Sequence, residues 1–252
     1  MTFTFKWQKL TSIPPLLPQQ VCVLAVPLEI ESVDLNSFKS LLSVDELRRA
    51  DRFVFPTDRA KFVLCRGTLR RLLGFYLSTN GGAVSLCVGD NGKLHLGDQV
   101  RIDIRFNLTH SKDLAVFAFA IGLELGVDIE SVDRARATEE VAHQHFSPKE
   151  RSDLARLPQP QRIEAFYRCW TRKEAYLKAR GDGLSIDLAS FDVSVFDESN
   201  PRLSAHDSTR WEMRSLNPVD GYLGAVVFET DAEVRSYWLT PHLLQDPAIH
   251  LR

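Results

Sequence analysis

One arrangement occurs twice in the sequence, and it constrains the fold more than any other feature. The motif Phe62-x-x-Cys65 opens one helix-like segment, and Phe166-x-x-Cys169 opens another in the second half of the chain. An apolar strand pattern follows each helix, at 114–119 and at 223–228. A helix-then-strand unit that is repeated in one chain predicts two similar subdomains. The cleft between two such halves is a natural place for a ligand.

We therefore expect an α+β fold built from two similar α/β subdomains that are related by a pseudo-twofold axis. In each, an antiparallel-rich sheet would pack on one long helix, and the active site would lie in the cleft between them. The first subdomain would comprise residues 1–122 and the second residues 123–252, within one structural unit. A chain of 252 residues is long enough to bury such a core.

Local patterns predict the main elements. Apolar residues at helical spacing predict a helix at 57–77, and segments of helical character lie at 45–52, 148–156 and 163–179. Gly181 would end the last helix, because glycine readily adopts left-handed backbone angles. Apolar runs predict strands at 21–26, 102–107, 114–121, 125–130, 222–228 and 234–239. Asn91-Gly92 predicts a type I′ hairpin turn.

Composition excludes several classes of function. Hydrophobic residues make up 44% and charged residues 25%, as in soluble globular proteins. The formal net charge of -2 provides no general attraction for nucleic acid or an anionic membrane, so a local basic cluster must hold any anionic ligand. No apolar stretch is long enough to span a bilayer, and residues 1–10 do not resemble a signal peptide. We expect a cytoplasmic protein whose four scattered cysteines are buried thiols: Cys22, Cys65, Cys87 and Cys169.

Two acidic residues stand out in the segment Gly126-Val127-Asp128-Ile129-Glu130. Side chains alternate in a strand, so Asp128 and Glu130 would share one face while Val127 and Ile129 point into the core. Neighbouring carboxylates repel each other unless a cation lies between them, and oxygen ligands suit a hard divalent ion such as magnesium. The alternative is an exposed strand end with solvated acids.

A third carboxylate lies in the segment Trp170 to Lys178. Glu174 and Lys178 are four residues apart, so they are neighbours on one face of the predicted helix. They form either a helix-stabilising ion pair or a metal ligand with a lysine that holds phosphate oxygens.

Two further segments have candidate roles. Asn107-Leu108-Thr109-His110-Ser111, which we expect at a strand end, concentrates hydrogen-bond donors suited to phosphate. Ser147-Pro148-Lys149-Glu150 has the pattern of a capping box at a helix start, which by itself explains Glu150.

Together these segments resemble the 4′-phosphopantetheinyl transferase superfamily, in its larger, monomeric, pseudo-dimeric class of the surfactin-synthetase-activating type. Three blocks carry the resemblance, which extends from about residue 45 to 184: Phe106 to Ser111, Gly126 to Glu130, and Trp170-x-x-Lys173-Glu174-Ala175-x-x-Lys178 followed by Gly181-Asp182-Gly183-Leu184.

The resemblance implies that the 4′-phosphopantetheine group of coenzyme A is transferred to a serine of an apo acyl or peptidyl carrier protein, which leaves the holo carrier protein and 3′,5′-ADP. Such carriers serve fatty-acid, polyketide or nonribosomal peptide synthesis, and which of them is modified stays open. One alternative is an inactive module that binds coenzyme A or a carrier protein. A remoter one is a metal-dependent hydrolase of a nucleotide pyrophosphate.

The resemblance also implies roles for individual residues. Asp128, Glu130 and Glu174 would bind magnesium, with manganese as a possible substitute, and Asp128 would contribute to coenzyme binding through the metal. Lys178 would contact the pyrophosphate. The 3′-phosphate would be held in the first subdomain by Arg49, Thr109 and His110. Lys93 matches a turn lysine at the coenzyme, although Leu94 replaces the family's proline. Glu150 matches a glutamate proposed as the general base, beside Glu174 and Lys178 as catalytic residues.

Overall fold

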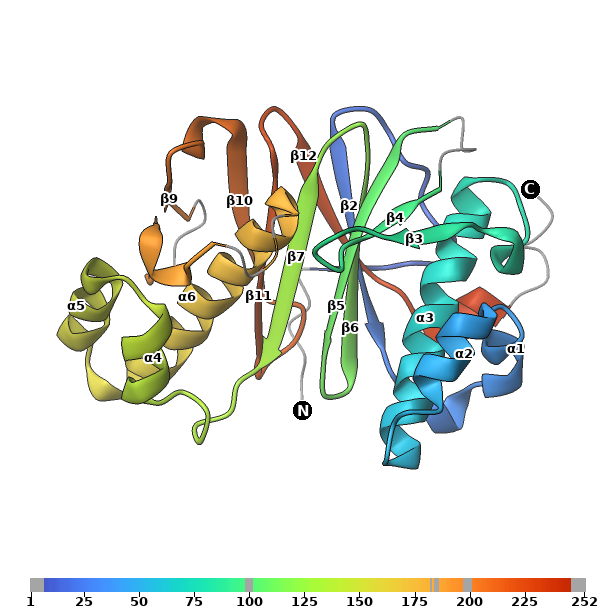
Figure 1. Ribbon diagram of the computed structural model, residues 1–252, viewed down its shortest axis with the longest axis horizontal. Helices are drawn as coiled ribbons and strands as arrows, with labels where there is room; N and C mark the ends of the chain where they lie inside the picture. The colour runs from blue at the N-terminus through green and yellow to red at the C-terminus, as the bar shows by residue number, and fades with distance from the viewer. Residues whose placement is uncertain (1–6, 98–101, 182, 184–185, 197–200, 246–252) are drawn as a thin grey trace.

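The computed structural model describes residues 7–97, 102–181, 183, 186–196 and 201–245. Two sheets lie next to each other in the middle of the molecule, and a long helix covers the outer face of each (Figure 1). These helices are α3 (Pro56–Tyr76) and α6 (Gln159–Arg180). The predicted α+β architecture of two helix-on-sheet units is confirmed.

The first sheet has the strand order β1-β12-β2-β6-β5. Its strands are β1 (Gln8–Lys9), β12 (Glu233–Trp238), β2 (Gln20–Pro27), β6 (Leu114–Ile121) and β5 (Ile104–Ser111). The pairs β2–β6 and β5–β6 are antiparallel, whereas β12 pairs in parallel with β1 and β2. The last strand of the chain thus joins the sheet of the first half, although we expected it to close the second half. The division at residue 122 stays a prediction.

The second sheet is antiparallel, with the order β10-β11-β7. Its strands are β10 (Trp211–Leu216), β11 (Tyr222–Glu229) and β7 (Leu125–Ser131). The helices α4 (Glu139–His145) and α5 (Pro148–Arg156) lie beside α6. Two short pairs complete the strands, a hairpin of β3 (Leu86–Val88) with β4 (Leu94–Leu96), and β8 (Asp192–Val193) with β9 (Leu203–Ser204).

Strand alternation produces a four-layer core. On β2, Leu24 faces α3, whereas Val23 faces the second sheet. On β7, Val127 and Ile129 pack into the cluster between the two sheets, as the period of two predicts. Asp128 and Glu130 therefore lie on the opposite face of β7.

Local signals explain where the helices begin and end. In the first half, α1 (Leu35–Lys39) and α2 (Val44–Ala50) precede α3, and Ser43 with Glu46 forms a capping box at α2. Pro56 occupies the first turn of α3, where its missing N–H costs nothing. Gly181 ends α6 with φ of 76°, as predicted. The short 3-10 segments are 30–32, 81–83, 188–190, 208–210 and 241–245.

Several sequence expectations need correction. β5 runs from Ile104 to Ser111, beyond the end that we predicted at residue 107, so the Asn107–Ser111 segment forms the last part of the strand itself. The reason is its full pairing with β6, which runs to a tight turn at Lys112, where φ is 48°. Sequence patterns also did not predict β10 or α4. All four cysteines are free; Cys22, Cys65 and Cys169 are buried as expected, but Cys87 is half-buried. Within the described residues, none of the helices has both the length and the apolarity to span a bilayer.

Candidate active site

A cleft of about 410 Å³ lies between the two halves. The β3–β4 hairpin, α3 and β5 contribute one side, and α6 contributes the other. It is lined by five of the residues that we predicted for the site: Arg49, Lys93, His110, Glu174 and Lys178. The predicted motif residues Asp182 and Leu184 lie outside the described residues.

Close packing of α6 on β7 brings the acidic residues together. Gly126 of β7 leaves no room for a side chain, because a Cβ atom there would lie 2.6 Å from the carbonyl carbon of Lys178. Lys178 Nζ can therefore reach across and pair with Asp128 Oδ1 at 2.6 Å. Helix and strand thus bring the charged groups of Glu174, Lys178, Asp128 and Glu130 close enough to interact, although only Glu174 and Lys178 line the cleft itself.

The carboxylates influence one another electrostatically. Asp128 is 4% exposed, and its Oδ2 is buried without a hydrogen-bond partner among the described residues. Burial is the main cause that raises the pKa of Glu174, and the negative charges of Asp128 and Glu130 raise it further. The pKa of Glu130 is raised by burial and by Asp128, against the opposing hydrogen bond from Ser111.

Polar side chains of β5 join the edge of the first sheet to β7. Asn107 Oδ1 accepts from the backbone N–H of Val127 at 3.0 Å. Two residues on, Thr109 Oγ1 donates to Asp128 Oδ1 at 3.1 Å. After two more, Ser111 Oγ donates to Glu130 Oε2 at 2.7 Å. These three residues share one face of β5.

These hydrogen bonds between β5 and β7 change the expected role of the Asn107–Ser111 segment. The hydroxyl of Thr109 donates a hydrogen bond to the carboxylate of Asp128, so Thr109 orients Asp128 in addition to any contact with a phosphate. Sequence reasoning named Asn107 and Ser111 only as phosphate-type donors. The signal that reveals their role is the alternation of small polar residues opposite the acidic alternation of 128 and 130.

The other wall of the cleft is basic. Arg49 lies over the ring of Phe62, with 5.4 Å from its guanidinium carbon to the ring centroid. His110 faces the cleft, and its pKa is lowered by desolvation and, secondly, by the nearby charges of Lys178, Lys61 and Arg49. An anionic group bound beside His110 would offset the positive charge of Lys178, Lys61 and Arg49.

Comparison with known proteins agrees with this geometry. A family model described as the 4′-phosphopantetheinyl transferase superfamily matches residues 124–227. The 4′-phosphopantetheinyl transferase HetI of Nostoc sp. is 36% identical over 212 residues, which cover 84% of this chain and 88% of HetI. This chain belongs to the 4′-phosphopantetheinyl transferase superfamily.

The similarity includes a member of the class of this superfamily that has longer, pseudo-dimeric chains. The 4′-phosphopantetheinyl transferase Sfp of Bacillus subtilis is 27% identical over 68% of this chain and 74% of Sfp. Among solved structures, the holo-[acyl-carrier-protein] synthase (AcpS) of Thermotoga maritima covers 44% of this chain and 64% of its own, at 20% identity and a TM-score of 0.34. With HetI and Sfp as relatives, the chain is a phosphopantetheinyl transferase of the HetI and Sfp type.

The structure places Glu150 apart from the cleft. Its side chain is fully buried at the start of α5, where Glu150 Oε2 accepts from the backbone N–H of Ser147 at 2.8 Å. Glu150 Oε1 pairs with Lys173 Nζ at 2.8 Å and accepts from the backbone N–H of Val193 at 2.7 Å. The capping box that the sequence predicts is present. Both oxygens are therefore engaged within the second half.

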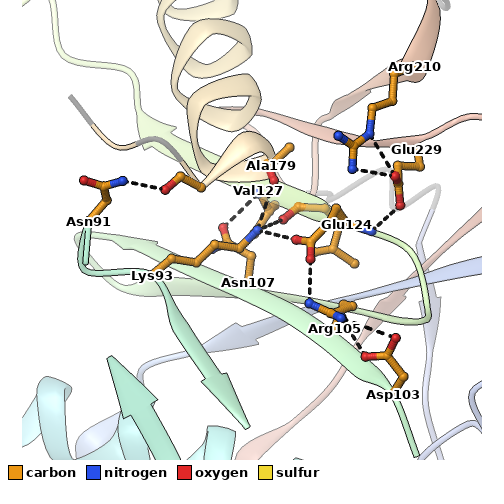
Figure 2. Close-up of polar contacts among 12 residues, drawn as sticks. Asn91, Lys93, Asp103, Arg105, Asn107, Glu124, Val127, Ala179, Arg210 and Glu229 are labelled. Atoms are coloured by element: carbon orange, nitrogen blue, oxygen red, sulfur yellow. Dashed lines mark hydrogen bonds and ion pairs between the residues drawn. The ribbon is translucent and has the colours of Figure 1, made fainter. Parts of the chain in front are cut away.

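Lys93 lines the cleft, but its ammonium group points to the second half of the chain (Figure 2). It contacts Glu124 and two backbone carbonyl oxygens there. A hairpin turn precedes it, as predicted, but the turn is not of type I′. Gly92 has a positive φ of 83°, whereas Asn91 does not have the positive φ that type I′ requires at both central residues.

Proposed function

We propose that this phosphopantetheinyl transferase uses coenzyme A and a divalent cation, Mg²⁺ or Mn²⁺, to convert an apo acyl or peptidyl carrier protein to its holo form. The observation that supports this most directly is the cleft between the halves, where Glu174 and Lys178 of α6 face the basic residues Arg49 and His110. One side suits a cation and the other suits phosphates, and coenzyme A carries a diphosphate and a 3′-phosphate.

The donor set fits a hard divalent cation. Across the part of the chain that the structure describes, no group of three or more His, Cys, Asp or Glu side chains is already arranged to hold a metal ion. However, Asp128 Oδ2 is buried without a partner, and the three carboxylates repel one another. Asp128, Glu130 and Glu174 would hold the ion. When bound, the ion would supply positive charge that offsets the negative charge developing on the 5′-phosphate of the leaving 3′,5′-ADP.

The protein's own residues would bind and orient the substrates. Lys178 would hold the pyrophosphate oxygens, and Arg49 with His110 would hold the 3′-phosphate. In the reaction the serine oxygen attacks the phosphorus that carries pantetheine, a P–O bond breaks, and 3′,5′-ADP leaves. Thr109 would keep Asp128 oriented during this step.

The serine hydroxyl must lose its proton, because it is a poor nucleophile at neutral pH. Of the two glutamates predicted as catalytic, Glu174 lines the cleft, whereas Glu150 is buried against Lys173. We therefore favour Glu174 as the proton acceptor. Glu150 would support the reaction by holding α5 and α6 together.

The cleft needs only one chain, because both of its sides come from the same polypeptide. We infer a monomer, with the division near residue 122 between a half that holds the 3′-phosphate and a half that holds the metal. The free thiols fit a reducing compartment, so we infer that the protein works in the cytoplasm.

The test is intact-mass spectrometry of apo carrier proteins incubated with this protein, coenzyme A and Mg²⁺. We expect a gain equal to one phosphopantetheine, which is lost with chelator and with Glu174→Ala. Glu164→Ala is the matched control, since Glu164 lies on the same helix with an exposed side chain that pairs with Arg168. Coenzyme A binding without any mass gain, across fatty-acid, polyketide and peptide carriers, would favour the binding module instead. Release of 3′,5′-ADP without a carrier protein would indicate the hydrolase.

A further inference from the structure

The β3–β4 hairpin crosses from the first half of the chain to the second at one end of the cleft, and Lys93 makes the contact (Figure 2). Lys93 Nζ lies 2.9 Å from Glu124 Oε2 and donates to the carbonyl oxygens of Leu125 at 3.1 Å and Ala179 at 3.0 Å. An ammonium group has three N–H donors, so these acceptors use all of them. In the same turn, Asn91 Nδ2 donates to the carbonyl oxygen of Gly181 at 3.0 Å.

The acceptors lie where the site geometry is set. Ala179 directly follows Lys178 in the last turn of α6, and Leu125 opens β7 three residues before Asp128. The last carbonyl groups of a helix lack intrahelical partners and carry partial negative charge. Lys93 donates one hydrogen bond to such a carbonyl group, that of Ala179, and another to the carbonyl group of Leu125 in the adjacent strand. It therefore links the end of α6 to the start of β7.

Glu124 is itself held in place, so it presents a fixed partner to the ammonium group. Its Oε1 accepts from Arg105 at 2.7 Å, and Arg105 also pairs with Asp103 at 2.6 Å. The backbone N–H of Glu124 donates to Glu229 Oε2 at 2.7 Å, and Glu229 pairs with Arg210 (Figure 2). This chain of contacts joins β5, the β6–β7 connection and the end of β11.

We propose that Lys93 is a positioning residue: it clamps the ends of α6 and β7 to the hairpin, and so sets where Lys178 and Glu174 stand against the basic wall. This proposal rests on the proposed function. A direct bond from Lys93 to the coenzyme, as the resemblance implies, would require its ammonium group to leave an acceptor. Leu94, in the place of the family's proline, pairs with Val88 and begins β4 immediately after Lys93.

Four variants separate the two roles. Lys93→Met removes the charge, Lys93→Arg keeps it, and Glu124→Gln weakens the clamp without touching the cleft wall. Lys39→Met, at an exposed lysine on α1, is the matched control. For each we would measure hydrogen exchange of residues 125–130 and 174–181, the Kd for 3′,5′-ADP by calorimetry, and kcat and KM with an apo carrier protein.

For Lys93→Met we expect faster exchange in both segments and a Kd within about twofold of wild type, since the ligand loses no direct contact. We expect kcat to fall by roughly 10- to 100-fold, as for other groups that orient catalytic residues. Glu124→Gln should reproduce this pattern more weakly, Lys93→Arg should recover part of the loss, and Lys39→Met should change nothing.

Unchanged exchange in Lys93→Met would overturn the proposal, as would a rise in Kd that Glu124→Gln does not share. Exchange and binding do not require turnover. Lys93 can therefore be judged even if no carrier protein is modified, an outcome that counts against the proposed function alone.

Discussion

The contact between β7 and α6 at Gly126 provides a severe test of the site geometry. In a Gly126→Ala variant the new methyl carbon would lie 2.6 Å from the carbonyl carbon of Lys178, and closer still to backbone atoms of Ala175 and Ala179. Ordinary contact begins at 3.4 Å. All of these atoms are backbone, so no side-chain rotation relieves the overlap. The helix must move away from the strand by at least about 0.8 Å (3.4 minus 2.6).

The displacement acts on stability and on activity. Overpacking of a rigid core costs typically 1–3 kcal/mol, and we expect at least about 3 kcal/mol here because three backbone atoms are involved. In a chain of this size, that lowers Tm by roughly 6–12 °C. Moving Glu174 and Lys178 by this distance from Asp128 should reduce kcat by about 100-fold, since reacting groups tolerate little misplacement.

The assay is thermal unfolding combined with carrier-protein modification. Gly82→Ala is the control, because the atom nearest to its new Cβ is a side-chain oxygen of Asn80 at 3.1 Å. It should stay within about 1 kcal/mol of wild type, as for most surface changes. Wild-type Tm and kcat in Gly126→Ala would refute the packing of α6 on β7 described above.

Three further predictions concern other contacts. Lys173→Met leaves the Glu150 carboxylate buried without its cation, so the free energy of unfolding in urea should fall by about 3–5 kcal/mol. Adding Glu150→Gln to this variant should recover part of the loss. A loss below about 1 kcal/mol would contradict the buried ion pair. Ser111→Ala removes the bond to Glu130 and should cost about 1–2 kcal/mol in thermal unfolding, whereas Ser111→Thr keeps the hydroxyl and should cost less. The pKa of His110 is lowered in the free protein, and a bound phosphate should raise it. Protonation of His110 should therefore strengthen the binding of 3′,5′-ADP, so the Kd measured by calorimetry should fall as the pH decreases from the pKa of the bound form to that of the free form. The Kd should fall by about tenfold for each pH unit between these two pKa values. His110→Gln should show only the titration of the phosphates themselves; an unchanged pH profile in this variant would exclude a contact with His110.

Much of the fold was accessible from the sequence, because its signals are local. The 148–156 helix and the 114–121 strand have the predicted bounds, and Gly181 ends α6 as its backbone freedom predicts. β10 was missed because its sequence, Trp211 to Leu216, mixes polar and apolar residues beside Pro218 and lacks a clear run. α4 was missed because its seven residues include only two apolar ones, Val141 and Ala142.

The candidate site was predicted in part. Period-two alternation correctly placed Asp128 and Glu130 on the face opposite Val127 and Ile129. Helical spacing placed Glu174 and Lys178 on one face of the helix, and in the structure both line the cleft. The partner of Lys178, however, is Asp128 of a neighbouring strand and not the glutamate one turn away, and local spacing favoured the latter.

What the sequence determined by itself is therefore most of the main helices and strands, the inward and outward faces of the 125–130 strand, and the family to which the motifs belong. Side chains repeat every two residues in a strand and every 3.6 residues in a helix, and these periods depend only on the local backbone and not on what the segment packs against. Only the tertiary structure decided that β12 pairs with β2 in the first sheet, that Ser111 donates a hydrogen bond to Glu130, and that Lys93 donates hydrogen bonds to the ends of α6 and β7. Each of these contacts joins residues distant in the chain, and their partners are selected by the packing of whole layers, which no local pattern encodes.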